Sequence, residues 1–183
     1  MRKLFVLAVG LLAASLAAPS NAAVKSGLGE GESPGAFHVL DVTGPSKGKK
    51  LCYRCQYGAK PVVSIFARNV NDELASLIKQ TDEFVGKNKD EKAAAFVVLL
   101  TDDPDAAEAE LKQLAEKHKI KNVPLTIFDG KAGPKGYKLS EDADVTVVMW
   151  KESSVKANHA YKKGELNKAE IEKIAKSTKK IID

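Results

Sequence analysis

Apolar residues follow two different spacings along this chain. Continuous apolar runs rich in β-branched residues are typical of strands buried in a sheet. Apolar stripes at intervals of three and four residues are typical of helices that cover one face of a sheet. The predicted strands span 37–42, 62–66, 94–100, 123–128, 145–150 and 155–161, and the predicted helices span 71–86, 104–119 and 167–182.

This alternation of strands and helices predicts the fold class. A strand–helix–strand unit followed by a second helix, further strands and a final helix predicts an α/β domain of three layers, with a central mixed sheet flanked by helices. Helix boundaries agree with the pattern, since Asp103 precedes Pro104 as an N-cap does and Asn167 forms a capping box with Glu170. We assign residues 36–183 to this single domain.

Residues 1–35 have the composition of segments outside the domain. Arg2 and Lys3 precede an uncharged apolar run, and small residues then lead to Ala22, which together predict a signal peptide over 1–22. The apolar run is short for a bilayer, so we expect an exported chain, periplasmic or secreted, with no membrane span after cleavage. Residues 23–35 are Gly-rich and lack periodicity, and we predict a flexible leader there.

Charge and aromatic content narrow the classes of partner. The formal net charge of the chain is +5, but its lysines are interleaved with Asp and Glu along the sequence. Only 6% of the residues are aromatic, so the chain offers no obvious stacking platform for bases. We therefore predict a solvated, mildly basic surface and no nucleic-acid partner.

The chemistry is predicted at the two cysteines. Cys52-Tyr53-Arg54-Cys55 has the CxxC spacing of a redox dithiol, and the sequence has no other cysteine. Several lysines and Arg54 surround the pair, and positive charge favours the nucleophilic thiolate. We predict Cys52 and Cys55 as catalytic residues, with Arg54 and Lys50 stabilising the thiolate. If the four residues form one helical turn, Cys52 lies at its N-terminal end and attacks first, while Cys55 lies deeper and acts as the resolving thiol.

Two other uses of the cysteine pair stay open. One is a structural disulfide, although the chain-entropy relation gives only about 2 kcal/mol for so short a loop. The other is a thiol-based carrier of a soft metal ion. No histidine has ligand spacing to the pair, so we predict no metal site, and Gln56 stands where covalent haem attachment needs His, so we predict no cofactor. The histidines considered are His38, His118 and His159.

The order of elements and several short motifs resemble the thioredoxin-like superfamily. Val123-Pro124 is similar to that family's strand-opening residue and cis-proline, and Tyr161 to Leu166, followed by a Lys-rich helix, is similar to its C-terminal ending. The front of the domain resembles the redoxin branch, which contains the alkyl hydroperoxide reductase and thiol-specific antioxidant proteins. The residues that match this branch are Phe37, Val39 or Leu40, Asp41, Gly44, Gly58 and Lys60 to Val63.

The resemblance implies a function and a position for the substrate. It implies thiol–disulfide exchange, with protein or small-molecule thiols and disulfides as partners, and it implies that Val123 and Pro124 bind substrate backbone opposite the dithiol. The family's reactive thiol follows the strand at 62–66, where this sequence has Ala67, Arg68 and Asn69. The dithiol is therefore displaced to the turn before that strand, and we expect no efficient peroxidase activity. The alternative is a non-catalytic thioredoxin-like binding module whose CxxC is only structural.

Overall fold

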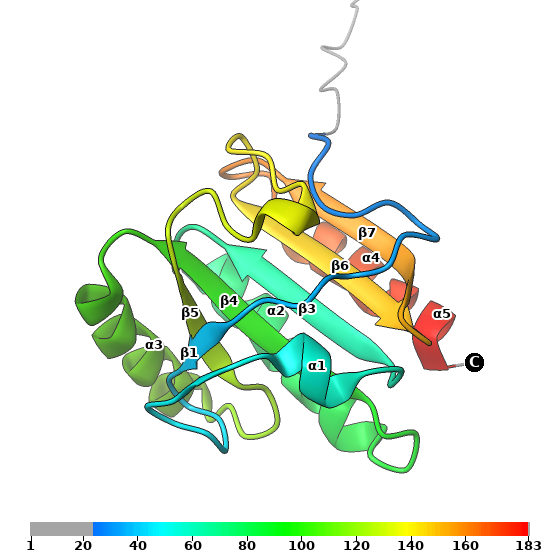
Figure 1. The fold of residues 1–183 in the computed structure, drawn as a ribbon, viewed down its shortest axis with the longest axis horizontal. Helices are drawn as coiled ribbons and strands as arrows, with labels where there is room; N and C mark the ends of the chain where they lie inside the picture. Colours follow the sequence, from blue (N-terminus) through cyan, green and yellow to red (C-terminus); the bar gives the residue numbers. More distant parts are fainter. Residues whose placement is uncertain (1–23, 183) are drawn as a thin grey trace, which may run out of the picture.

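The structure, a computed structural model, describes residues 24–182, so the predicted signal peptide at 1–22 lies outside the described residues. No helix in the described part of the chain is long and apolar enough to cross a membrane. The elements in chain order (Figure 1) are β1 (Val39–Asp41), β2 (Lys50–Leu51), α1 (Tyr53–Tyr57), β3 (Val62–Ala67), α2 (Asp72–Lys87), β4 (Ala94–Thr101), α3 (Pro104–His118), β5 (Leu125–Asp129), the 3₁₀ helix η1 (Lys135–Tyr137), β6 (Val145–Lys151), β7 (Ser154–Tyr161), α4 (Lys168–Ser177) and α5 (Lys179–Ile182).

The strands described form one mixed sheet in the order β2-β1-β5-β4-β3-β6-β7. β5, β4 and β3 run parallel in its centre, and antiparallel strands flank them on both sides. β3 is buried along its whole length, as expected for a central strand covered on both faces. The strands predicted near 62–66, 94–100 and 124–128 are thus confirmed as neighbours in one sheet.

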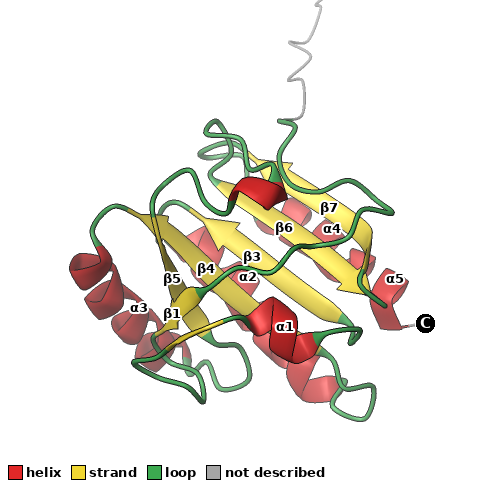
Figure 2. Ribbon diagram, viewed as in Figure 1, coloured by secondary structure: helices red, strands yellow, loops and turns green. Residues whose placement is uncertain are grey.

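The two faces of the sheet are covered in different ways (Figure 2). On one face α2, α3 and α4 pack through aliphatic side chains such as Leu74, Leu111 and Ile174. On the other face an aromatic layer that includes Phe37 and Phe96 lies beneath α1, η1 and the segment before β1. The predicted three-layer α/β fold is confirmed, and the cysteines belong to the aromatic side of the sheet.

Residues 24–35 correct one expectation, because they pack against the sheet instead of forming a flexible leader. The Asn158 side-chain amide donates hydrogen bonds of 2.8 Å to the carbonyls of Ser26 and Leu28. Leu28 is only 3% exposed and belongs to the aromatic side of the core. Gly27 has φ +89°, and a Cβ there would lie 2.7 Å from the Asn158 side chain, so glycine permits this close approach.

Candidate redox site

The cysteines lie where β2 turns into α1, and they form a disulfide with a Cα–Cα distance of 5.2 Å. Cys52 is the N-cap of α1, and its Sγ accepts a hydrogen bond of 3.1 Å from the backbone N–H of Cys55. The four residues therefore do form one helical turn with Cys52 at its N-terminal end. The predicted depths are wrong, however, because Cys52 is 7% exposed and Cys55 is exposed to solvent. An attacking thiol thus meets Cys55 before Cys52.

The burial of Cys52 follows from its neighbour Tyr53, which anchors α1 to the sheet. The Tyr53 ring stacks on Phe96 with centroids 5.6 Å apart, and its hydroxyl donates a 2.8 Å hydrogen bond to Asp41. Burial, and then the hydrogen bond to the Asp41 carboxylate, raise the pKa of Tyr53 far above its usual value. The phenol therefore stays protonated and keeps donating to Asp41 at any ordinary pH.

Asp41 connects the same anchor to the loop that carries the basic residues. It is 1% exposed, and its two carboxylate oxygens accept hydrogen bonds from the backbone N–H groups of Gly44 and Ser46 at 2.7 and 2.8 Å. Together with the Tyr53 hydroxyl, these donors satisfy the buried carboxylate. Asp41 thereby fixes both the loop before β2 and the position of α1.

The two cations predicted to stabilise a thiolate have different surroundings. Arg54 lies in α1, and its Nε donates a 2.8 Å hydrogen bond to the carbonyl of Pro34, which ties the helix to the N-terminal segment. Lys50 lies on β2, two residues before Cys52, and is exposed. Their predicted effect on the cysteine thiolate stays a prediction.

The predicted substrate-binding residues Val123 and Pro124 lie just before β5. The described residues contain no cis peptide bond, so the predicted cis-proline at Pro124 is wrong. Tyr53, the residue after Cys52, stacks on Phe96, and the N–H of the neighbouring Val97 donates to the Pro124 carbonyl at 2.9 Å, so α1 crosses the sheet near the start of β5. Val123 is buried, at 3% exposure. Substrate binding by Val123 and Pro124 stays a prediction.

The segment that lies beside the end of β3 is the one that leads into β6. Ala67 pairs with Val145, the first residue of β6. Arg68 donates to the carbonyl oxygens of Ala143 and Ser140, both at 2.9 Å, and to that of Lys131. Sequence reasoning saw only that residues 67–69 lack a thiol, because the carbonyls that Arg68 binds lie far away in the chain. This end of the sheet is held together by an arginine instead of carrying a reactive group.

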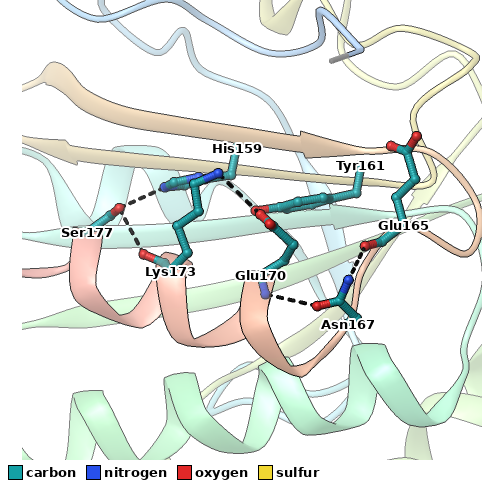
Figure 3. A network of polar contacts seen from close by, with 7 residues as sticks. All are labelled: His159, Tyr161, Glu165, Asn167, Glu170, Lys173 and Ser177. Atoms are coloured by element: carbon teal, nitrogen blue, oxygen red, sulfur yellow. Dashed lines mark hydrogen bonds and ion pairs between the residues drawn. The ribbon is translucent and has the colours of Figure 1, made fainter. Parts of the chain in front are cut away.

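A polar network links β7 to α4 at the opposite edge of the sheet from β2 (Figure 3). His159 Nε2 lies 2.9 Å from Ser177 Oγ, and the Tyr161 hydroxyl donates a 2.9 Å hydrogen bond to Glu170. Burial, and then the Lys173 charge, lower the pKa of His159 below its usual value. The network contains no cysteine, and its contacts hold α4 against the sheet.

Other hollows and histidines do not form a second reactive centre with the cysteines. A hollow of about 880 Å³ lies beside this network, but its lining includes no residue of β2 or α1. His38 is exposed just before β1, and no group of three His, Cys, Asp or Glu side chains within residues 24–182 is placed to hold a metal ion. The disulfide is therefore the feature of the described chain on which a chemical function is best argued.

Comparison with known proteins identifies the fold. No protein-family model matches the chain, and no curated protein matches it in sequence. A protein of Chlorobium tepidum, assigned as the thiol:disulfide interchange protein DsbE, aligns with a TM-score of 0.66 and 11% identity over 85% of this chain and 99% of that one. A 1-Cys peroxiredoxin of yeast mitochondria aligns with a TM-score of 0.57 and 13% identity over 81% of this chain and 75% of that one.

A third solved structure is a secreted disulfide oxidoreductase of Mycobacterium tuberculosis that is homologous to E. coli DsbE. It aligns with a TM-score of 0.53 and 9% identity over 78% of this chain and 94% of that one. At these identities the likeness concerns the backbone fold. The sheet order, the helices and these alignments agree, and the chain has a thioredoxin-like fold.

Proposed function

We propose that this protein exchanges disulfides with protein thiols through Cys52 and Cys55. The observation that carries the proposal is the asymmetry of the pair: Cys55 is exposed, while the Cys52 Sγ is buried and accepts the Cys55 N–H at 3.1 Å. An accessible sulfur suits attack by an incoming thiolate, and a hydrogen-bonded sulfur suits departure as a thiolate.

The exchange proceeds in two balanced steps. A client thiolate attacks Cys55 Sγ, the Cys52–Cys55 bond breaks, and a mixed disulfide forms between the client and Cys55 while Cys52 leaves as a thiolate. A second client thiolate then attacks the client sulfur of the mixed disulfide and releases Cys55. The client is oxidised to a disulfide, the protein is reduced to a dithiol, and the two protons of the client thiols end on Cys52 and Cys55. The reverse sequence reduces a client disulfide.

The local packing supports exchange over a purely structural role. A disulfide that closes so short a loop contributes only about 2 kcal/mol in the chain-entropy relation. The turn that it closes is already fixed by the Tyr53–Asp41 hydrogen bond and by the bond from Arg54 to Pro34. The covalent link therefore adds little to the stability of α1.

A structural disulfide in a non-catalytic binding module is the second candidate. The burial of Cys52 favours it, because a buried sulfur is protected from reagents. The end of β3 also lacks the thiol that the redoxin resemblance leads one to expect, since Arg68 and Asn69 occupy it. A thiol-based metal carrier has no comparable support.

We also propose that the chain acts after export. The predicted signal peptide at 1–22 supports this, and so does the secreted oxidoreductase of similar fold. An oxidising compartment would keep a CxxC pair as a disulfide when no reductant reaches it.

The reduction potential of the Cys52–Cys55 pair tests the proposal. It is measured by equilibration with dithiothreitol or glutathione buffers, followed by alkylation and intact mass. Exchange predicts a potential of roughly −120 to −270 mV, the range of known exchange proteins. A potential below about −300 mV would favour the structural disulfide.

A further inference from the structure

β2 forms one edge of the sheet and leads directly into the disulfide. It is the outermost strand on its side, and no strand within residues 24–182 pairs with its outer edge. The carbonyl of Lys49 faces β1, because it accepts a 3.0 Å hydrogen bond from the Asp41 N–H. Backbone groups alternate in direction along a strand, so the N–H and C=O of Lys50 face outward. The edge therefore offers one donor and one acceptor beside Cys52.

The same edge carries exposed lysines that form no ion pair with the acidic residues near them in the described part of the chain. These lysines are Lys47, Lys49 and Lys50. The carboxylate closest in sequence, Asp41, is buried and occupied by the Tyr53 hydroxyl and two backbone N–H groups. Exposed lysines elsewhere do pair with acids, as Lys131 does with Asp102 at 3.1 Å.

A small hollow lies next to this edge. It measures about 270 Å³, and its walls include His38 and Lys50 together with the largely apolar surface of Phe128, while Asp129 adds one carboxylate. This volume accommodates a side chain, not a whole client. Apart from His38 and Lys50 its lining comes from β1, β5 and the start of α3, so a side chain placed there lies on the face of the sheet that α3 covers.

We propose that the outer edge of β2 binds an extended, acidic, cysteine-bearing segment of the client polypeptide as an added strand. The open backbone groups of Lys50 hold its main chain, and the lysines at 47–50 attract its carboxylates. At about 3.3 Å per residue, a client cysteine a few residues beyond the paired position reaches the disulfide. This inference rests on the proposed exchange function and specifies its substrate.

Peptides with a single cysteine test this inference. Three peptides of equal length carry the cysteine among Glu, Gln or Lys residues, and the rate of mixed-disulfide formation with the oxidised protein is followed by intact mass at low salt. Every peptide rate is divided by the rate at which dithiothreitol, which attacks as a thiolate but carries no carboxylate, reduces the same variant. The variants are Lys47→Glu/Lys49→Glu and, as a control with the same charge change, Lys162→Glu/Lys163→Glu. The control lysines are exposed and follow β7 at the other edge of the sheet.

The expected result is a normalised rate for the Glu peptide that falls by about tenfold or more in Lys47→Glu/Lys49→Glu and is unchanged in the control. Because each peptide is compared with itself across variants, differences in its own thiol pKa cancel. Methylating alternate backbone nitrogens of the Glu peptide, in each of the two possible frames, should slow the reaction in one frame only.

Three results overturn the inference, and they separate it from the proposed function. Equal effects of the two double substitutions, with normal reduction by dithiothreitol, exclude acidic recognition at β2 and leave exchange intact. Equal rates for the unmethylated peptide and both methylated frames exclude strand addition. Failure of dithiothreitol and of every peptide to open the disulfide overturns the exchange function together with the inference.

Discussion

The Tyr53 hydroxyl donates a 2.8 Å hydrogen bond to the Asp41 carboxylate, and each residue is only 1% exposed. This contact joins α1, which begins beside Cys52, to the loop that precedes β2. Because the carboxylate also holds two backbone N–H groups of that loop, the disulfide and the basic edge are positioned by one buried polar group. The site therefore depends on a residue that takes no part in the chemistry.

Tyr53→Phe should destabilise the fold by about 2 kcal/mol, since hydrogen bonds to charged groups contribute more than neutral ones and the buried carboxylate loses a donor. Urea unfolding measures this change. Tyr57→Phe is the matched control, because the Tyr57 hydroxyl makes only a long 3.5 Å contact with the carbonyl of Ala95. It should cost less than about 1 kcal/mol. Equal losses in both variants would show that the Asp41 contact is not an anchor.

Replacing both cysteines by alanine should reduce the free energy of unfolding by no more than about 2 kcal/mol, because the disulfide closes a very short loop. The reduced wild-type protein is the companion sample and should lose a similar amount. Urea titration of the three forms gives the comparison. A loss above about 4 kcal/mol, or failure of the variant to fold, would exceed what the short loop explains and favour the structural role.

Stability should depend on pH through His159. In the folded protein, burial and the charges of Lys173 and Lys180 disfavour its protonated ring, while Glu170 and Glu30 partly oppose them, and the net pKa lies below 6.5. The unfolded chain then binds more protons than the folded chain once the pH falls through about 6.5, so stability is full above that pH and decreases below it.

His159→Gln should flatten this part of the profile. Urea midpoints are measured at pH 7.5 and pH 5.5 for the wild type and the variant, and the change in midpoint between the two pH values is compared. Glutamine can keep a hydrogen bond to Ser177, so the absolute stability at one pH is not the informative quantity. A pH dependence in the variant equal to that of the wild type would assign the effect to other groups.

The elements of the fold could be predicted because their signals are local and long. The apolar run at 94–100 and the capping sequences at Asp103 and Asn167 predict a strand and two helix starts from local residues alone, before the elements that pack against them are known. The cis-proline could not be predicted, because a Val-Pro pair opens many kinds of strand and sequence alone does not say which strand lies beside it. In this fold Pro124 leads into β5, which pairs in parallel with β4 through backbone hydrogen bonds that need no cis bond.

The depth of the cysteines and the packing of residues 24–35 could not be predicted for a related reason. Cys52 is buried because the adjacent Tyr53 inserts between Phe96 and Asp41, which are distant in sequence. Ser26 and Leu28 are held by Asn158, whose position beside them is set by the sheet. A high glycine content indicates that ordering the segment costs much conformational entropy. Whether the segment is ordered depends on its contacts with residues distant in sequence.

Exchange through the exposed Cys55 is tested by asking which single-cysteine variant captures a disulfide client. Reduced Cys52→Ser and Cys55→Ser are incubated with a disulfide-bonded peptide, and mixed disulfides are counted by intact mass after acid quenching. Since Cys55 is exposed and Cys52 is 7% exposed, Cys52→Ser should form the mixed disulfide at Cys55 about tenfold faster than Cys55→Ser forms one at Cys52. Faster capture by Cys55→Ser, or no capture by either variant, would contradict exchange through an exposed Cys55.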